Sequence, residues 1–253
     1  MAAGIEPMDA IQQRIFNIRE NCTHHEGRIN RTGNITIEPV QLICYGPSLR
    51  DTWKEIDPQK CIVTTSGAND FLRFFGITPH YHVEFDWRVH KAGLVNNIGD
   101  TQFLLESCVN PNLCKKLPNI ALWHADQTPA EAEAIKELEP EATLIQGGSS
   151  AGLRAIELFY WLGFRRFEIH GMDSSFRDEK WAGPHKDKVR RVTIDISVKG
   201  RSFKTSLAFL HYATEFGYLR RRYPGLKMRL HGDGLLQTMM EKISDVPRSS
   251  HSC

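Results

Sequence analysis

Four short segments of the sequence combine glycine, hydroxyl or charged residues in patterns that suit ligand binding. The first is Gly46-Pro47-Ser48, which follows the apolar run 40–45. Gly46 would let backbone approach a ligand closely, and Ser48 could cap a following helix whose N-terminus attracts phosphate. The triplet is also typical of a plain turn with a helix cap, so both interpretations stay open.

The second segment, residues 147–150, lies between the apolar run 143–146 and the apolar, helix-like segment 150–163. It contains glycines, hydroxyls and backbone N–H groups at an expected helix start, which together form a cradle for an anion. The spacing matches neither a dinucleotide-binding fingerprint nor a Walker loop, because no lysine follows the glycines. Tight packing of a helix on a strand is the alternative. The candidate ligand-binding residues are Gly147, Gly148, Ser149 and Ser150.

The third segment places Asp173 at the end of the expected strand 164–171, and His185 follows in a polar stretch. A carboxylate at a strand end could bind ribose hydroxyls, a base or a metal ion. Histidine titrates near neutral pH, so His185 could act as a general acid or base. A single loop histidine is also compatible with an ordinary surface position.

The fourth segment alternates polar and apolar residues, which places His80, His82, Glu84 and Asp86 on one face of an expected strand. Such a face could suggest a metal site, but the pattern supplies no further ligands. We therefore expect a half-polar strand face and keep only Asp86, at the strand end, as a site candidate.

The elements that must hold these turns follow from the alternation of short apolar runs with amphipathic segments, which predicts βαβ units and a parallel sheet. We expect a Rossmann-like, doubly wound and mostly parallel α/β sheet, in which ligands collect beyond the carboxyl ends of the strands. An N-terminal helical arm and linker, 1–38, would precede a single domain, 39–253. Expected strands are 40–45, 60–66, 80–86, 119–125, 143–146, 164–171 and 226–232; expected helices are 48–56, 69–76, 129–138, 150–163, 204–224 and 235–243.

Composition limits the class of protein. The chain has 253 residues, of which 41% are hydrophobic and 25% charged. These values are typical of a globular protein and exclude disordered and fibrous classes. No apolar run approaches the roughly 18 to 20 residues that span a bilayer, and the first residues lack the pattern of a secretory signal. The six cysteines form no CxxC pair, so we expect a cytoplasmic protein with reduced thiols rather than a disulfide or zinc framework.

The formal net charge of +2 conceals an uneven distribution along the chain. The segment from Lys180 to Arg229 contains thirteen Lys and Arg residues but only three Asp and Glu residues. This asymmetry predicts an anionic partner or substrate near that region. A solvated helix face that complements the dipole at a helix end would explain part of it equally well.

The four turns in this order resemble the MptE-like domain family, which includes archaeal 6-hydroxymethylpterin diphosphokinases and Maf-type flagellin glycosyltransferases. The resemblance rests on ICYGPSL, on CIVTTSGANDFLRFFGITPHYHVEFD, and on IQGGSSAGLRAIELFYWLGFRRFEIHGMDSSF followed by a histidine. It covers about residues 40–190. The pattern is also similar to bacterial sialyltransferases that use CMP-sialic acid. It departs from those enzymes at Tyr45, where they have asparagine, and Ser174 and Ser175 are more polar than the MptE-like pattern.

The resemblance implies a role for each matching residue. Asp173 would bind ribose or a metal ion, and His185 would match the proposed general base of the sialyltransferases. Ser66 would lie near the base or sugar of a nucleotide. Donor phosphate or ribose would contact Gly46, Pro47 and Ser48, and the nucleotide would contact Gly148, Ser149 and Ser150.

These features favour a transferase that moves a sugar from a nucleotide sugar to a hydroxyl acceptor, which could be an anionic polymer. His185 would deprotonate the acceptor, and cationic side chains would neutralise the leaving phosphate. The first alternative is transfer of a pyrophosphoryl group from ATP with Mg²⁺; whether Mg²⁺ serves the glycosyl reaction stays open. A second is a non-catalytic nucleic-acid-binding protein that uses 220–222. The candidate cationic residues are Lys186, Lys188, Arg190 and Lys204.

Overall fold

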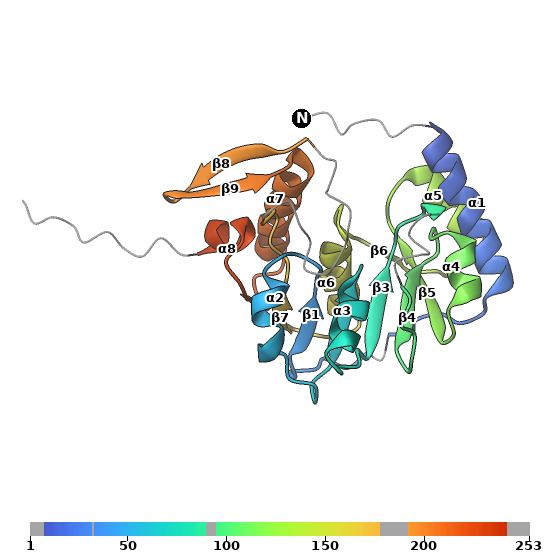
Figure 1. Cartoon of the computed structure of the whole chain (residues 1–253). Helices are drawn as coiled ribbons and strands as arrows, with labels where there is room; N and C mark the ends of the chain where they lie inside the picture. Colours follow the sequence, from blue (N-terminus) through green and yellow to red (C-terminus); the bar gives the residue numbers. More distant parts are fainter. Residues whose placement is uncertain (1–7, 32, 90–94, 178–191, 242–253) are drawn as a thin grey trace, which may run out of the picture.

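The computed structural model describes residues 8–31, 33–89, 95–177 and 192–241. Within these residues, eight parallel strands form one sheet in the order β10-β7-β1-β2-β3-β4-β5-β6 (Figure 1). The expected doubly wound α/β fold is confirmed. The strands are β1 (Val40–Ile43), β2 (Ile62–Thr65), β3 (Tyr81–Glu84), β4 (Gln102–Glu106), β5 (Ile120–Ala125), β6 (Leu144–Ile145), β7 (Arg166–His170) and β10 (Lys227–Leu230).

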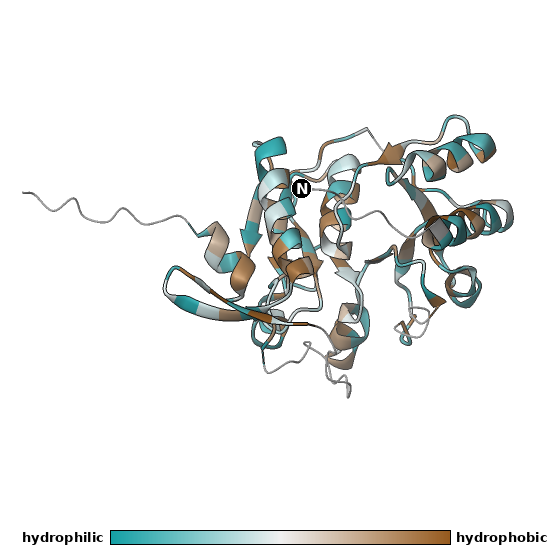
Figure 2. Cartoon of the chain, turned by 90° about the horizontal axis from the view of Figure 1, so that it is seen from above, coloured by the Kyte–Doolittle hydropathy of each residue, from teal (hydrophilic) through white to brown (hydrophobic). Residues whose placement is uncertain are grey.

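Helices cover both faces of the sheet because successive side chains of each strand point to opposite faces. Val40 and Leu42 of β1 belong to the core beneath α6 (Ala151–Trp161) and α7 (Leu207–Arg222). Ile43 points the other way, into a second core. Figure 2 shows apolar residues concentrated on the strands and on the inner sides of the helices. The second face is covered by α2 (Leu49–Thr52), the short 3₁₀ helix η1 (Trp53–Glu55), α3 (Ala68–Phe74) and α4 (Pro111–Lys116).

The N-terminal helix α1 (Met8–His24) packs against α5 (Pro129–Leu138) and attaches to the sheet through buried polar side chains. The Asn17 side-chain amide donates to the Cys108 carbonyl at 2.9 Å, and the Asn21 amide donates to the Ser107 carbonyl at 2.9 Å. Arg14 forms a fully buried ion pair with Glu131 at 2.7 Å. These contacts fix α1 over the loop that follows β4.

Two features of the fold were not expected from the sequence. Strand β4 is absent from the expected strands, although it lies between β3 and β5. A separate antiparallel hairpin, β8 (Ile194–Val198) and β9 (Arg201–Thr205), precedes α7. The expectation that a helix begins at Lys204 is therefore wrong, because Lys204 belongs to β9 and α7 begins at Leu207.

Over the described part of the chain, no helix combines the length and the apolar character that a membrane crossing requires. Cys22, Cys44, Cys61, Cys108 and Cys114 all carry free thiols, so none of these five forms a disulfide. Burial raises the pKa of the Cys44 and Cys61 thiols to about 12. Such thiols stay protonated and are poor nucleophiles at neutral pH.

Candidate functional site

The topology of the sheet has a switch point between β1 and β7. The chain runs from β1 outward to β6 and then returns to place β7 on the other side of β1. Ligands of open α/β sheets bind at such points, beyond the carboxyl ends of the strands. The loops 44–48 and 171–177 leave the two strands here, and they contain the first and third of the segments singled out from the sequence.

These two loops touch each other through glycine backbone. The Gly46 amide donates to the Gly171 carbonyl at 2.8 Å. A Cβ atom on Gly46 would collide with the Gly171 carbonyl oxygen and the Asp173 carboxylate, and one on Gly171 would collide with the Cys44 carbonyl oxygen. Gly171 also has a φ of 66°, which favours glycine. The glycines therefore bring the two strand ends into direct contact.

Asp173 is bound by residues of the neighbouring loops. Its carboxylate accepts a hydrogen bond from the Ser48 amide at 2.8 Å, another from the Ser48 hydroxyl, and a longer one from Gln237 at 3.3 Å. Only 3% of Asp173 is exposed, and this burial raises its pKa while the Ser48 hydrogen bonds oppose the rise. The expected cap by Ser48 is corrected: its hydroxyl bonds Asp173, and no side-chain cap of α2 forms.

The glycine- and serine-rich loop 146–150 lies beside the switch point. Gly152, in the first turn of α6, has no room for a Cβ next to Met172 and Cys44. Ser150 caps α6 by accepting a hydrogen bond from the Leu153 amide at 3.3 Å. The remaining loop residues pack closely on the helix: a Cβ on Gly147 or on Gly148 would come within 3.0 Å of the Arg154 or Leu153 side chain, respectively. The loop thus combines the packing role and the helix start that its sequence allowed.

The loop 146–150 is hydrogen-bonded to a carboxylate from another helix. Glu215 of α7 accepts hydrogen bonds from the Ser149 amide at 3.1 Å and from the Ser149 hydroxyl at 3.0 Å. Ser149 immediately precedes the Ser150 cap of α6, where the helix dipole is positive. The Ser149 backbone and side chain therefore bind an oxyanion, and here the protein supplies it.

Ser66 and Asp86 follow the neighbouring strands at the same edge. Ser66 has a φ of 52°, an uncommon left-handed conformation for a residue other than glycine, in the turn after β2. The next residue, Gly67, lies under the Tyr45 ring, which leaves no space for a Cβ. Asp86, after β3, accepts hydrogen bonds from the Arg88 amide at 3.1 Å and the Arg88 guanidinium Nε at 2.8 Å.

A buried ion pair between α6 and β4 was missed by the sequence analysis. Arg154 donates to Glu106 at 2.9 Å, and the two side chains are 8% and 3% exposed. The Arg154 guanidinium also lies 4.5 Å from the centre of the Phe85 ring, after β3. Burial raises the pKa of Glu106, whereas the Arg154 charge opposes the rise. The available signal was a single arginine in the mostly apolar stretch AGLRAIELF, and its partner lies in strand β4, which the sequence analysis did not predict.

The remaining sequence candidates divide into two groups. Lys204 lies in β9, and its carbonyl accepts a hydrogen bond from the Phe176 amide at 2.8 Å, which joins the hairpin to the loop that contains Asp173. The other candidates, namely His185, Lys186, Lys188 and Arg190, lie outside the described residues. The roles assigned to all the candidate residues stay predictions.

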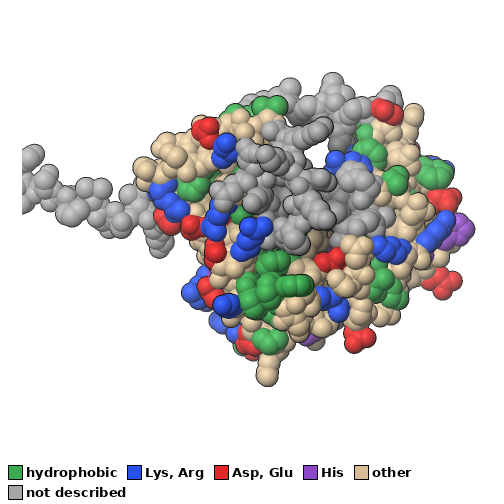
Figure 3. Space-filling model, viewed as in Figure 1, with side chains coloured by type: hydrophobic (Ala, Val, Ile, Leu, Met, Phe, Trp, Pro, Cys, Tyr) green, Lys and Arg blue, Asp and Glu red, His purple; other side chains and the backbone are tan. Residues whose placement is uncertain are grey.

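The basic part of the sequence is less one-sided in space than along the chain. In Figure 3, Lys and Arg side chains gather near β8–β9 and α8 (Leu235–Met240), with Asp and Glu side chains among them. Acidic partners come from other segments. The pairs are Arg201 with Asp233 at 3.8 Å, Arg222 with Glu157 at 3.7 Å and Arg229 with Glu168 at 4.0 Å.

Comparison with known proteins shows the family of the chain and a similar fold. The family model described as 6-hydroxymethylpterin diphosphokinase MptE-like matches residues 13–179. Comparison with curated proteins gives no significant match. Among solved structures, the Maf glycosyltransferase from Magnetospirillum magneticum AMB-1 is similar, with a TM-score of 0.67 and 14% sequence identity. The alignment covers 88% of this chain but only 36% of that protein, and at this identity it supports the fold alone.

Proposed function

Because the chain belongs to the MptE-like family, we propose that it is a nucleotide-dependent transferase, and specifically a glycosyltransferase that uses a nucleotide-sugar donor. The observation that carries the proposal is that the Ser149 amide and hydroxyl both donate hydrogen bonds to the Glu215 carboxylate. A phosphate oxygen has the same charge and accepts the same hydrogen bonds. The α6 dipole would favour it, since anions bind at helix N-termini.

The donor would lie across the switch point. Its phosphates would contact loop 146–150, and its nucleoside would extend toward loop 44–48 and Ser66. In this arrangement Asp173 acts mainly through Ser48, whose amide and hydroxyl it holds. Asp173 is therefore assigned as a positioning residue for the Gly46-Pro47-Ser48 loop rather than as a ligand of the donor.

The proposed transfer is a displacement at the sugar. His185 would take the proton of the acceptor hydroxyl, and the acceptor oxygen would bond the anomeric carbon as the bond from that carbon to the donor phosphate breaks. The electron pair of that bond remains on the leaving nucleotide. Cationic side chains from the segment that contains Lys186, Lys188, Arg190 and Lys204 would stabilise the resulting negative charge.

Pyrophosphoryl transfer is the second candidate, and the description of the matching family model favours it. The same loops would then hold ATP, and Mg²⁺ would bridge its phosphates. The two reactions differ in the nucleotide and in the need for a metal ion. Both require the Ser149 loop to accept phosphate, so they share the observation that carries the proposal.

A thermal-shift panel of CMP, UDP, GDP, ADP and ATP, with and without Mg²⁺, separates the two candidates. A ligand that binds only the folded state increases the free energy of unfolding by RT ln(1 + [L]/Kd) and thereby raises the unfolding midpoint. We expect one of the first three nucleotides to raise it without metal. ATP stabilisation that needs Mg²⁺ would favour pyrophosphoryl transfer, and a panel without any shift would contradict both reactions.

Two variants test the assigned positions. Glu215→Gln removes the competing anion and should tighten nucleotide binding by about two- to fivefold, since a charge at a helix N-terminus is worth ~0.3–1 kcal/mol. Glu133→Gln, on α5, is the matched control and should change nothing. Unchanged affinity in Glu215→Gln would place the phosphate elsewhere.

His185→Ala should abolish turnover while nucleotide binding persists, and unchanged turnover would remove His185 from the role of base.

A further inference from the structure

Three side chains that could bind a metal ion meet at the β5–β6 edge of the sheet, away from the switch point. They are Cys22 at the end of α1, His124 in β5 and Glu139 directly after α5. One potential ligand atom from each lies within 4.8 Å of the others. Among the described residues, no other group of three His, Cys, Asp or Glu side chains comes this close together.

His124 is oriented as metal-binding histidines usually are. Its Nε2 lies 3.2 Å from a Glu139 carboxylate oxygen, and its Nδ1 lies 3.0 Å from the Ser107 hydroxyl. A hydroxyl that accepts the Nδ1 proton would leave the Nε2 lone pair directed at an ion between His124 and Glu139. In that tautomer the neutral imidazole can bind the ion through Nε2.

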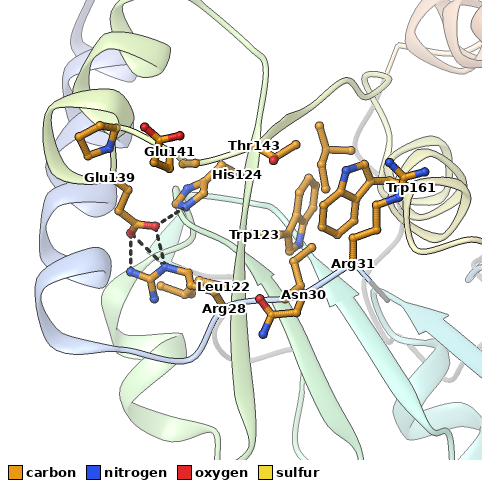
Figure 4. A pocket seen from close by; sticks show the side chains of 14 residues that line it. Arg28, Asn30, Arg31, Leu122, Trp123, His124, Glu139, Glu141, Thr143 and Trp161 are labelled. Atoms are coloured by element: carbon orange, nitrogen blue, oxygen red, sulfur yellow. Dashed lines mark hydrogen bonds and ion pairs between the residues drawn. The ribbon is translucent and has the colours of Figure 1, made fainter. Parts of the chain in front are cut away.

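Arg28 supplies the positive charge of this cluster in the structure. Its Nε donates to both Glu139 oxygens at 3.0 Å (Figure 4). Burial alone would raise the pKa of Glu139, but the hydrogen bonds and charges of Arg28 and His124 hold it at about 2. A second cation near Cys22 would be attracted by the Glu139 carboxylate, which lies beside the thiol.

Two members of the cluster, His124 and Glu139, line a cavity of about 520 Å³, which gives an ion bound to them access to water. Cys22 is not among the residues that line it. His124, Glu139 and Arg28 line one end of it, and Trp123 and Trp161 line the other (Figure 4). Zinc sites that bind a water molecule combine three protein ligands with one open position. Cys22, His124 and Glu139 provide three ligands of the right types, and the cavity has room for the fourth.

We propose that Cys22, His124 and Glu139 bind a divalent transition-metal ion such as Zn²⁺, with water from the cavity as the fourth ligand. The thiolate and imidazole favour this class of ion over Mg²⁺ or Ca²⁺, which prefer oxygen ligands. Thiolate and carboxylate together balance the two positive charges of the ion. Arg28 then loses its hold on Glu139, because metal and guanidinium compete for the same oxygens. The site is independent of the proposed transferase reaction.

Cobalt titration of the full chain tests the site directly, because Co²⁺ substitutes for Zn²⁺ and a thiolate ligand gives a charge-transfer absorption band. We expect a band that saturates at one equivalent and is lost in Cys22→Ser. Cys61→Ser is the matched control, since Cys61 is another half-buried thiol outside the cluster, and it should keep the band. No band with cobalt in excess, or a band that persists in Cys22→Ser, would overturn the proposal.

Arg28→Met distinguishes a metal site from a simple ion-pair cluster. If the ion competes with Arg28, the variant should bind cobalt about fivefold more tightly, equivalent to ~1 kcal/mol for a partly exposed ion pair. Glu139→Gln should weaken binding in the same assay. Weaker cobalt binding by Arg28→Met would overturn the proposal, because the cluster would then need Arg28 to keep its shape.

Discussion

The switch point and the β5–β6 edge both place polar side chains at the ends of parallel strands, but the burial and the hydrogen-bond partners of these side chains differ between the two regions. At the switch point, Asp173 is 3% exposed and its carboxylate is held by Ser48 and Gln237. At the edge, the Glu139 side chain is 25% exposed and lines a cavity. The first arrangement fixes backbone loops in place, whereas the second leaves side chains able to exchange one partner for another.

This difference indicates which atoms can bind a ligand in each region. At the switch point, a ligand would have to use groups at the margin of the packed loops, such as the Ser149 amide and hydroxyl, where one carboxylate is already bound. At the edge, an ion would bind the side chains themselves. The comparison therefore predicts large costs in stability for changes in the buried polar groups near the switch point and small ones for changes in the partly exposed ion pairs at the edge.

Arg154→Met should give the largest effect. It leaves Glu106 buried without its cationic partner, which typically costs ~3–5 kcal/mol. The matched control is Arg19→Met at the edge, where the ion pair with Glu137 is about half exposed and worth less than ~1 kcal/mol. Urea unfolding of both variants measures the difference. Equal losses would mean that the candidate site is not fixed by its buried polar contacts.

Asp173→Asn should cost less, ~1–3 kcal/mol, because an amide replaces a carboxylate that accepts two hydrogen bonds from Ser48. Asp233→Asn, whose side chain is 64% exposed beside Arg177, is the control and should cost less than ~1 kcal/mol. Nucleotide affinity should fall together with stability if Asp173 positions the loop. A stable Asp173→Asn variant that binds nucleotide normally but loses turnover would instead assign Asp173 to the reaction itself.

The sequence predicted the switch-point region well because its information is local. Each turn there is a contiguous run that contains glycine and hydroxyl residues at the end of an expected strand, so the parallel sheet and the position of these turns beyond its strand ends followed. The contact between loops 44–48 and 171–177 was not predicted. That Asp173 would bind Ser48 could not be deduced, since the two residues are 125 positions apart. The β5–β6 edge was invisible for the same reason, because Arg28 and Glu139 are separated by 111 positions.

Two of the missed elements had different causes. Strand β4 reads QFLLE, a leucine-containing run without β-branched residues, which local preference does not separate from a helix. The β8–β9 hairpin did carry a signal, because IDISV and RSFKT alternate around Lys199-Gly200, and both turn residues have positive φ values of 49° and 75°.

The smallest predicted effect concerns the pH dependence of stability, which should differ between a histidine near the switch point and a histidine at the edge. His170, at the end of β7, stacks on His231 at 4.0 Å, and its Nδ1 has no hydrogen-bond partner among the described residues. Burial, with the nearby His231 and Arg229, lowers its pKa to about 3. The unfolded chain takes up a proton near pH 6.5 and the folded chain does not, so stability must fall as pH decreases between these values.

Between about pH 7.5 and about pH 5.5, the free energy of unfolding of His170→Gln should fall by about 1.4 kcal/mol less than that of the wild type. The measurement is the free energy of unfolding at both pH values. His124→Gln is the matched variant at the edge: burial lowers the pKa of His124 too, but the Glu139 charge opposes that shift. Its pH dependence should therefore change less than that of His170→Gln. An equal change would show that Glu139 does not stabilise the charged form of His124, and the edge would then behave like the closed switch point.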